Sequence, residues 1–146
     1  MKALKIKRVS DKAILPRRAT EGSAGMDLSA CLEEPVTIAP GERVRIPTGI
    51  AIGLPSKETV GLVYARSGMA VRDGIALTNG VGVIDSDYTG EIQVGLINLS
   101  KEPYTINPGQ RIAQLVVAPV LLPAIEEVED LTETQRGSGG FGSTGR

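Results

Sequence analysis

The stretch Thr37-Ile38-Ala39-Pro40-Gly41-Glu42-Arg43-Val44 is echoed further along the chain by Thr105-Ile106-Asn107-Pro108-Gly109-Gln110-Arg111-Ile112. In each stretch a Pro-Gly pair separates two short apolar and β-branched runs, a pattern typical of strand, tight turn and strand. Two such units of one design fit a jelly roll built from two β-sheets. Two turns that arose independently would give the same match, so the echo alone does not establish a duplication.

The remainder of the chain continues this pattern of short β-strands. Runs rich in Val and Ile are separated by Gly or Pro, which is the spacing of an all-β protein. The pair Asn79-Gly80 lies between two such runs and predicts a two-residue β-hairpin, because both positions tolerate positive φ. One short helix is predicted over residues 67–71, with Ser67 capping its start and Gly74 ending it. The predicted strands are residues 4–8, 26–30, 36–38, 42–47, 49–53, 59–64, 75–78, 82–84, 91–98, 104–106 and 111–119.

Composition excludes several classes of function. The net charge of −1 argues against non-specific binding to a nucleic-acid backbone. The absence of histidine excludes a His-based triad or metal site. A single cysteine, Cys31, excludes an internal disulfide and is expected to be a buried structural thiol. Because no segment is long and apolar enough to act as a signal peptide or to span a membrane, we expect a cytoplasmic protein.

The C-terminal tail differs from the rest of the chain. Five of the eleven residues from Arg136 to Arg146 are glycine, and the chain's only phenylalanine, Phe141, lies among them. Such a segment cannot fold by itself, so a disordered terminus is one interpretation. The other is a nucleotide-binding arm, in which the aromatic ring faces a base and Arg136, Ser143 and Thr144 reach phosphate oxygens. We expect one jelly-roll core over residues 1–125 and a linker with a flexible arm over residues 126–146.

An acidic cluster follows the predicted strand over residues 82–84. Asp85 and Asp87 are two residues apart, and strand periodicity would place both carboxylates on one face. One carboxylate could act as a general base on water, or the two could hold a divalent cation. An ordinary loop with aspartates at turn positions would have the same sequence.

Three further segments carry polar groups in unusual places. Arg66, Ser67 and Gly68 begin the predicted helix, where free amides suit a phosphate, although a capped surface helix is the alternative. Asp27 lies inside an apolar strand and should pair with an arginine or serve a site, because an unpaired buried carboxylate is costly. Gln114 is likewise a polar residue in an apolar strand.

Together, five segments resemble the motifs of the trimeric dUTPases (deoxyuridine triphosphate nucleotidohydrolases). They are AGMDLSA (24–30), ARSGMA (65–70), GVIDSDYTGE (82–91), GQRIAQLVV (109–117) and RGSGGFGSTG (136–145), and they span nearly the whole chain. The one departure is Met26, which replaces a common aromatic residue and should affect packing rather than chemistry. The resemblance implies a homotrimer of jelly rolls whose active sites draw on all three subunits, without nucleic-acid or membrane partners.

The resemblance also implies an activity, namely hydrolysis of dUTP to dUMP and pyrophosphate, which keeps uracil out of DNA and supplies dUMP for dTMP synthesis. Asp85 would activate the water that attacks the α-phosphorus. Mg²⁺ would be held by the phosphates, with Asp27 acting through coordinated water. Tyr88 would pack under the deoxyribose and leave no room for a 2′-hydroxyl.

The remaining implied roles concern substrate binding. The uracil edge would meet the segment around Asn79, Gly82 and Gln93. Phosphate oxygens would be bound by Ser67, Gly68 and Gln114, with Arg66 in support. The arm would place Phe141 on uracil and Arg136, Gly142, Ser143 and Thr144 around the phosphates.

Two alternatives remain at this point. A related dCTP deaminase would need a glutamate just past the third motif, where this chain has Gly95. A binding or regulatory protein on the same fold would be expected to have lost part of the motif set, which is complete here.

Overall fold

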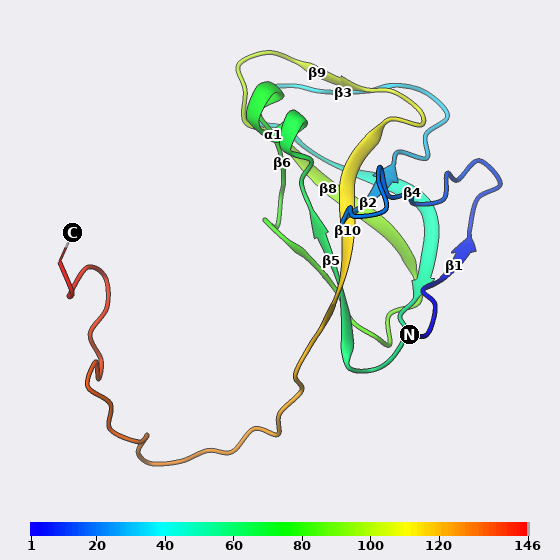
Figure 1. Cartoon of the computed structure of the whole chain (residues 1–146). Coiled ribbons are helices and arrows are strands. Elements are labelled where there is room, and N and C mark those ends of the chain that lie inside the picture. The colour runs from blue at the N-terminus through cyan, green and yellow to red at the C-terminus, as the bar shows by residue number, and fades with distance from the viewer. Residues whose placement is uncertain (146) are drawn as a thin grey trace.

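Two four-stranded antiparallel sheets form the body of the molecule (Figure 1). The computed structural model describes residues 1–145, in which one sheet has the order β1-β4-β8-β6, the other β2-β10-β5-β7, and β3 pairs with β9 in a short third sheet. The strands are β1 (Lys5–Arg8), β2 (Met26–Ser29), β3 (Val36–Ile38), β4 (Arg43–Gly53), β5 (Thr59–Tyr64), β6 (Ile75–Leu77), β7 (Gly82–Ile84), β8 (Glu91–Asn98), β9 (Tyr104–Ile106) and β10 (Arg111–Pro119).

The core lies between the two large sheets and contains aliphatic side chains from both. Ile46 and Leu96 of the first sheet and Leu28 and Leu115 of the second are at most 1% exposed and belong to one buried cluster. Burying such side chains supplies the main stabilising term, at roughly 1.5–3 kcal/mol each. The two packed sheets, with a single short helix over the described residues, confirm the all-β prediction.

The two echoed stretches pair with each other. Strands β3 and β9 run antiparallel with Thr37 opposite Thr105, and their hydroxyl oxygens are 2.9 Å apart. Gly41 and Gly109 both have φ of 77°, as the predicted Pro-Gly turns require. The repeated design thus forms two equivalent corners, one leading into each large sheet.

Residues 42–47 and 49–53 were predicted as two strands but belong to the single strand β4. Its pairing with β8 shifts between Pro47 and Ala51, which marks a bulge. Gly49 lies in this bulge with φ of 69°, which explains why the sequence reads as a break between strands. The buried Thr48 hydroxyl donates a 2.5 Å hydrogen bond to the carbonyl of Ile92 and keeps the strands together.

The hairpin predicted at Asn79-Gly80 is wrong. Strand β6 pairs with β8 in one sheet, and β7 pairs with β5 in the other. The turn at Gly80, with φ of 74°, carries the chain from one sheet to the other. Turn chemistry was therefore identified correctly, but it did not determine which strands pair.

The helix α1 (Ser67–Asp73) is longer than predicted and begins differently. Arg66, rather than Ser67, occupies the N-cap position, and no side chain caps the helix. Gly74 ends it in the left-handed conformation as predicted, with its amide bonded to helix carbonyls.

Replacing Gly49 with alanine should destabilise the fold by about 2–4 kcal/mol, because a positive φ and close packing both oppose a side chain. A Cβ there would lie 2.7 Å from Cys31 Sγ and 2.9 Å from Ala13 Cβ. Gly41→Ala is the matched control: its φ is also positive, but no atom lies within 4 Å, so it should cost only about 1 kcal/mol. Urea denaturation of both variants measures the difference, and equal losses would contradict the packing argument.

Candidate active site

A pocket of about 550 Å³ lies where β7 and the turn after it face β8. It brings together five of the predicted site residues, and it also contains Arg45 and Glu91, which were not predicted. The predicted residues in its lining are Asn79, Gly82, Asp85, Tyr88 and Gln93. One open pocket therefore combines a carboxylate, a phenol, two amide side chains and the backbone of a glycine.

The loop after β7 positions Asp85. The strand ends at Ile84, and the Tyr88 amide donates a 3.1 Å hydrogen bond to the Asp85 carbonyl, which closes a turn. The expectation that Asp85 and Asp87 share a strand face is therefore wrong, because strand alternation stops before both. Asp85 lines the pocket, whereas Asp87 does not, although both residues are exposed.

Tyr88 is fixed by its hydroxyl and by a glycine beneath its ring. The hydroxyl donates a 2.8 Å hydrogen bond to the carbonyl of Glu91. A Cβ at Gly90 would lie 2.7 Å from the Tyr88 hydroxyl oxygen and 2.9 Å from ring atom Cζ, so a larger residue would require the tyrosine to move. The residue is 48% exposed, which leaves part of its surface available to a ligand.

A second polar group surrounds Asp27 on β2. One carboxylate oxygen lies 3.3 Å from Arg66 Nε, and the other lies 3.2 Å from Arg111 Nη1. The prediction that Asp27 pairs with an arginine is confirmed. Arg111 was not foreseen as a partner, because the pairing of β10 with β2 that brings it to Asp27 cannot be read from the sequence.

Gln114 lies on β10, next to β2 and Asp27 in the same sheet, and it contacts the segment just before α1. Gln114 Nε2 donates a 3.0 Å hydrogen bond to the carbonyl of Ala65, directly before Arg66. Gly25 makes room for this side chain, since a Cβ there would lie 2.3 Å from Gln114 Oε1. Ser67 and Gly68 are exposed at the first turn of α1, where uncapped amides remain available to an anion.

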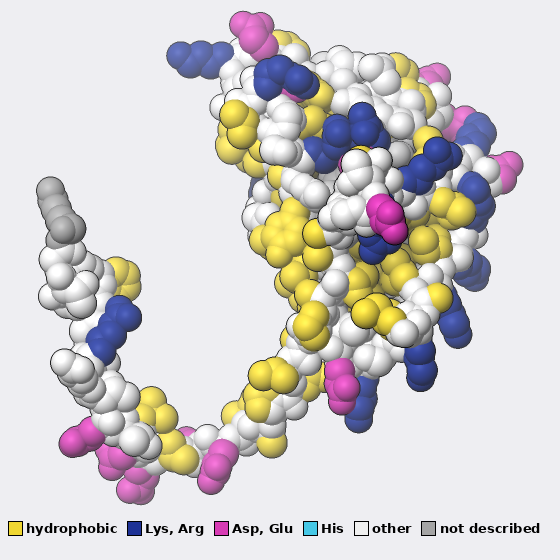
Figure 2. Space-filling model, in the orientation of Figure 1, with side chains coloured by type: hydrophobic (Ala, Val, Ile, Leu, Met, Phe, Trp, Pro, Cys, Tyr) yellow, Lys and Arg dark blue, Asp and Glu magenta, His cyan; other side chains and the backbone are white. Residues whose placement is uncertain are grey.

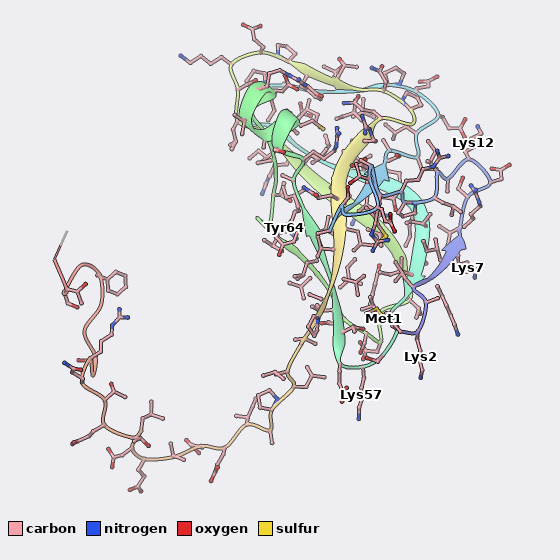
Figure 3. The ribbon with its side chains drawn as sticks, viewed as in Figure 1. Met1, Lys2, Lys7, Lys12, Lys57 and Tyr64 are labelled. Atoms are coloured by element: carbon pink, nitrogen blue, oxygen red, sulfur yellow. The ribbon has the colours of Figure 1, made fainter. Side chains whose placement is uncertain are left out.

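The structure does not unite all the predicted residues in one place. The pocket lining lacks Asp27, Arg66–Gly68 and Gln114. The C-terminal segment leaves the body after β10 and curves away from it (Figures 1 and 3). Phe141 is fully exposed, and Arg136 bonds within the arm, to the carbonyl of Gly139 at 2.6 Å. The predicted arm residues Arg136, Phe141, Gly142, Ser143 and Thr144 thus lie apart from the pocket of their own chain, and Arg146 lies outside the described residues.

The described residues offer limited support for a metal ion. Over residues 1–145 no three acidic or cysteine side chains gather in a metal-binding cluster. The Asp27 carboxylate is shared between two guanidinium groups, which suits contact through water better than direct ligation. The donor set fits an ion that arrives with phosphate oxygens. In the same range, no helix has the length and apolar character needed to cross a membrane.

Gly95 bears on the deaminase alternative. A Cβ at this position would lie 2.4 Å from Thr78 Oγ1. A glutamate could be placed there only if Thr78 moved, so the present arrangement of the pocket opposes the catalytic group that the alternative requires.

Fold and pocket together define a jelly-roll protein with a site suited to a nucleotide. The dUTPase family model matches residues 11–145, and the chain belongs to this family. Two deoxyuridine 5′-triphosphate nucleotidohydrolases are close in sequence. The one from Desulfitobacterium hafniense is 52% identical and covers 99% of both chains, and the one from Legionella pneumophila is 49% identical and covers 95% of this chain and 91% of the relative.

Solved structures agree with the jelly-roll fold. A mutant dUTPase of Staphylococcus bacteriophage 80alpha with dUpNHpp has a TM-score of 0.90 at 28% identity and covers 100% of both chains. A mutant dUTPase from phage phi11 of S. aureus, which coordinates a structural Mg(II) ion, has a TM-score of 0.81 at 26% identity over 90% of this chain and 99% of that one.

Replacing Asp27 with asparagine should lower the free energy of unfolding by about 1–3 kcal/mol, because two guanidinium groups lose one partly buried counter-charge. Asp73→Asn is a matched control. Hydrogen bonds from Arg72 lower the pKa of Asp73, but that arginine is 74% exposed, so the loss should be smaller. Urea denaturation at neutral pH compares the two, and a larger loss for Asp73→Asn would contradict the assignment.

Proposed function

We propose that this chain hydrolyses dUTP to dUMP and pyrophosphate, with a water molecule activated by Asp85. The family and the named relatives support the reaction. The observation that carries the mechanism is the single pocket that Asp85 shares with Tyr88 and Gly82. A chain without histidine can perform this chemistry, because phosphoryl transfer depends on positioning and charge stabilisation.

In this mechanism Asp85 accepts a proton from the water as its oxygen attacks the α-phosphorus, and pyrophosphate leaves. Tyr88 supports the deoxyribose and excludes a 2′-hydroxyl. Asn79, Gln93 and the backbone at Gly82 contact the uracil edge. A Cβ at Gly82 would lie 3.1 Å from the Val63 side chain, so glycine lets this backbone pack closely against β5. We propose that the same backbone meets the uracil edge too closely for a 5-methyl group.

The triphosphate would extend toward the second polar group. Ser67, Gly68 and Gln114 bind its oxygens, and Arg66 supports them while paired with Asp27. Mg²⁺ held by the phosphates would reduce their negative charge, with Asp27 contacting it through water. The phi11 relative coordinates a structural Mg(II) ion, so a dUTPase of this fold can bind this metal.

We also propose a homotrimer in the cytoplasm, in which the core (1–125) and arm (126–146) of different chains meet at shared sites. The segment after β10 supports this, because its large apolar side chains have no partner within the described chain: Leu121, Leu122, Ile125 and Leu131 are 67–100% exposed. Acidic side chains gather along the same segment, whereas basic ones gather on the body (Figure 2). Lys2, Lys7 and Lys12 point outward there (Figure 3).

The reaction is tested by pyrophosphate release from dUTP, dCTP, dTTP and UTP in the presence of Mg²⁺. We expect pyrophosphate release from dUTP to be much faster than from the other three nucleotides. The backbone at Gly82 should reject the methyl group of dTTP, and Tyr88 should reject the 2′-hydroxyl of UTP. Ammonia release from dCTP would instead indicate a deaminase, and release from none would overturn the proposal.

The Asp85→Asn variant refines this test. It should bind dUpNHpp nearly as well as the wild type but lose about 10²–10⁴-fold in kcat, because the amide cannot accept the proton. Asp87→Asn is the control, since Asp87 belongs to the same loop but not to the pocket lining. A normal kcat for Asp85→Asn would exclude it as the general base.

Deleting residues 136–146 should leave a folded trimer with kcat/KM reduced by about 10²-fold or more, because closure by the arm would no longer exclude water. Sedimentation and circular dichroism check the assembly. Phe141→Trp should give fluorescence that responds to dUpNHpp. An unfolded or monomeric deletion product would show that the arm is structural, and a silent tryptophan would argue against stacking.

A further inference from the structure

We infer that Glu91 is a positioning residue that fixes Tyr88 to the buried bulge of β4 and so sets the preference for deoxyribose over ribose. The inference rests on the proposed function, since it concerns how the same pocket distinguishes dUTP from UTP. Glu91 itself belongs to the pocket lining.

The first link joins Glu91 to the bulge. The regular pairing of β4 with β8 stops at Pro47, which lies opposite Gln93. It resumes at Ala51, which lies opposite Glu91. The residues between have no partner on β8, so the buried Gly49 amide needs another acceptor on that side. Glu91 Oε1 provides it at 3.0 Å.

The second link joins Glu91 to the tyrosine. The Tyr88 hydroxyl donates to the Glu91 carbonyl at 2.8 Å, and no other hydrogen bond from this side chain is present within residues 1–145. Because the residue is 48% exposed, packing alone does not hold the ring. Its position therefore depends on that of the Glu91 backbone.

The bulge is a rigid foundation for both links. The Gly49 carbonyl accepts hydrogen bonds from the amides of Val9 at 2.8 Å and Ser10 at 3.3 Å. Thr48 ties the bulge to the Ile92 carbonyl, one residue after Glu91. Through its carboxylate and its carbonyl, Glu91 thus links the fixed bulge of β4 to the exposed ring of Tyr88.

Sugar selection by exclusion depends on small displacements. A 2′-hydroxyl adds one oxygen atom, and a ring that can move away by about an ångström no longer rejects it. Loss of the Glu91 carboxylate should therefore affect UTP and dUTP differently, whereas a general loss of stability should affect both alike.

The experiment compares kcat/KM for dUTP and UTP in full-length variants. Glu91→Ala and Tyr88→Phe should each lower the dUTP preference about tenfold, mainly by raising turnover of UTP, as loss of one hydrogen bond predicts. Glu91→Gln keeps an acceptor for the Gly49 amide and should restore most of the preference. Glu91→Asp, which retains the charge but withdraws it by one methylene, should behave as Glu91→Ala and serves if the alanine variant does not fold.

Glu42→Ala is the matched control. Its carboxylate also accepts a backbone amide, that of Ala39 at 2.9 Å, but in a turn outside the pocket. It should lower stability without changing the dUTP preference. An unchanged preference in Glu91→Ala and Glu91→Asp, or an equal change in Glu42→Ala, would overturn the inference. Wild-type protein that does not hydrolyse dUTP would overturn the proposed function instead.

Discussion

The bulge in β4 is the constraint on which the pocket and much of the fold depend. Strand β4 is the longest in the first sheet and pairs with both β1 and β8. In a regular strand Gly49 would pair with β8. Instead, its φ is positive, and its α-carbon packs closely against Ala13 and Cys31, which leaves no room for a side chain. The amide and carbonyl freed from the ladder bind Glu91 and the loop after β1. One irregularity therefore joins the amino-terminal loop, the central strand pair and the wall of the pocket.

Most strands could be predicted because their ends coincide with local signals. β3, β5, β7, β8, β9 and β10 begin and end as predicted, since Gly, Pro or polar residues bound each apolar run. The failures arise where partners distant in sequence decide. At Pro47–Gly49 the sequence indicates a break, but hydrogen bonds from Thr48 and to Glu91 continue the strand. At Asn79-Gly80 the turn is real, yet tertiary packing sends its two flanking strands to different sheets.

The site was predictable to the extent that its residues are chemically out of place in their segments. Asp27 in an apolar strand demanded a cation, and the structure supplies Arg66 and Arg111. Glu91 gave no such signal, because a glutamate at the first residue of a strand is ordinary in sequence. Its contact with Gly49 exists only because of a bulge 42 positions away. The helix start misled for a similar reason: Ser67 is a good cap residue, but Arg66 occupies the cap position while its side chain binds Asp27.

The echoed turns show how structure and chemistry are divided within one chain. The amides of Gly41 and Gly109 donate to the carbonyls of Asn98 and Ala30, respectively, in equivalent geometry at 2.7 and 2.8 Å. Both turns thus hold the end of a neighbouring strand. In the second copy Arg111 follows the turn and meets Asp27 on β2. In the first copy Arg43 has no such acid, because Arg43 lies opposite Ile97 as Arg111 lies opposite Ser29, and Gly95 then stands at the position that corresponds to Asp27. The shared Pro-Gly turns build the fold, and the shared arginine takes part in the site only in the second copy, where the neighbouring strand β2 offers it an acid.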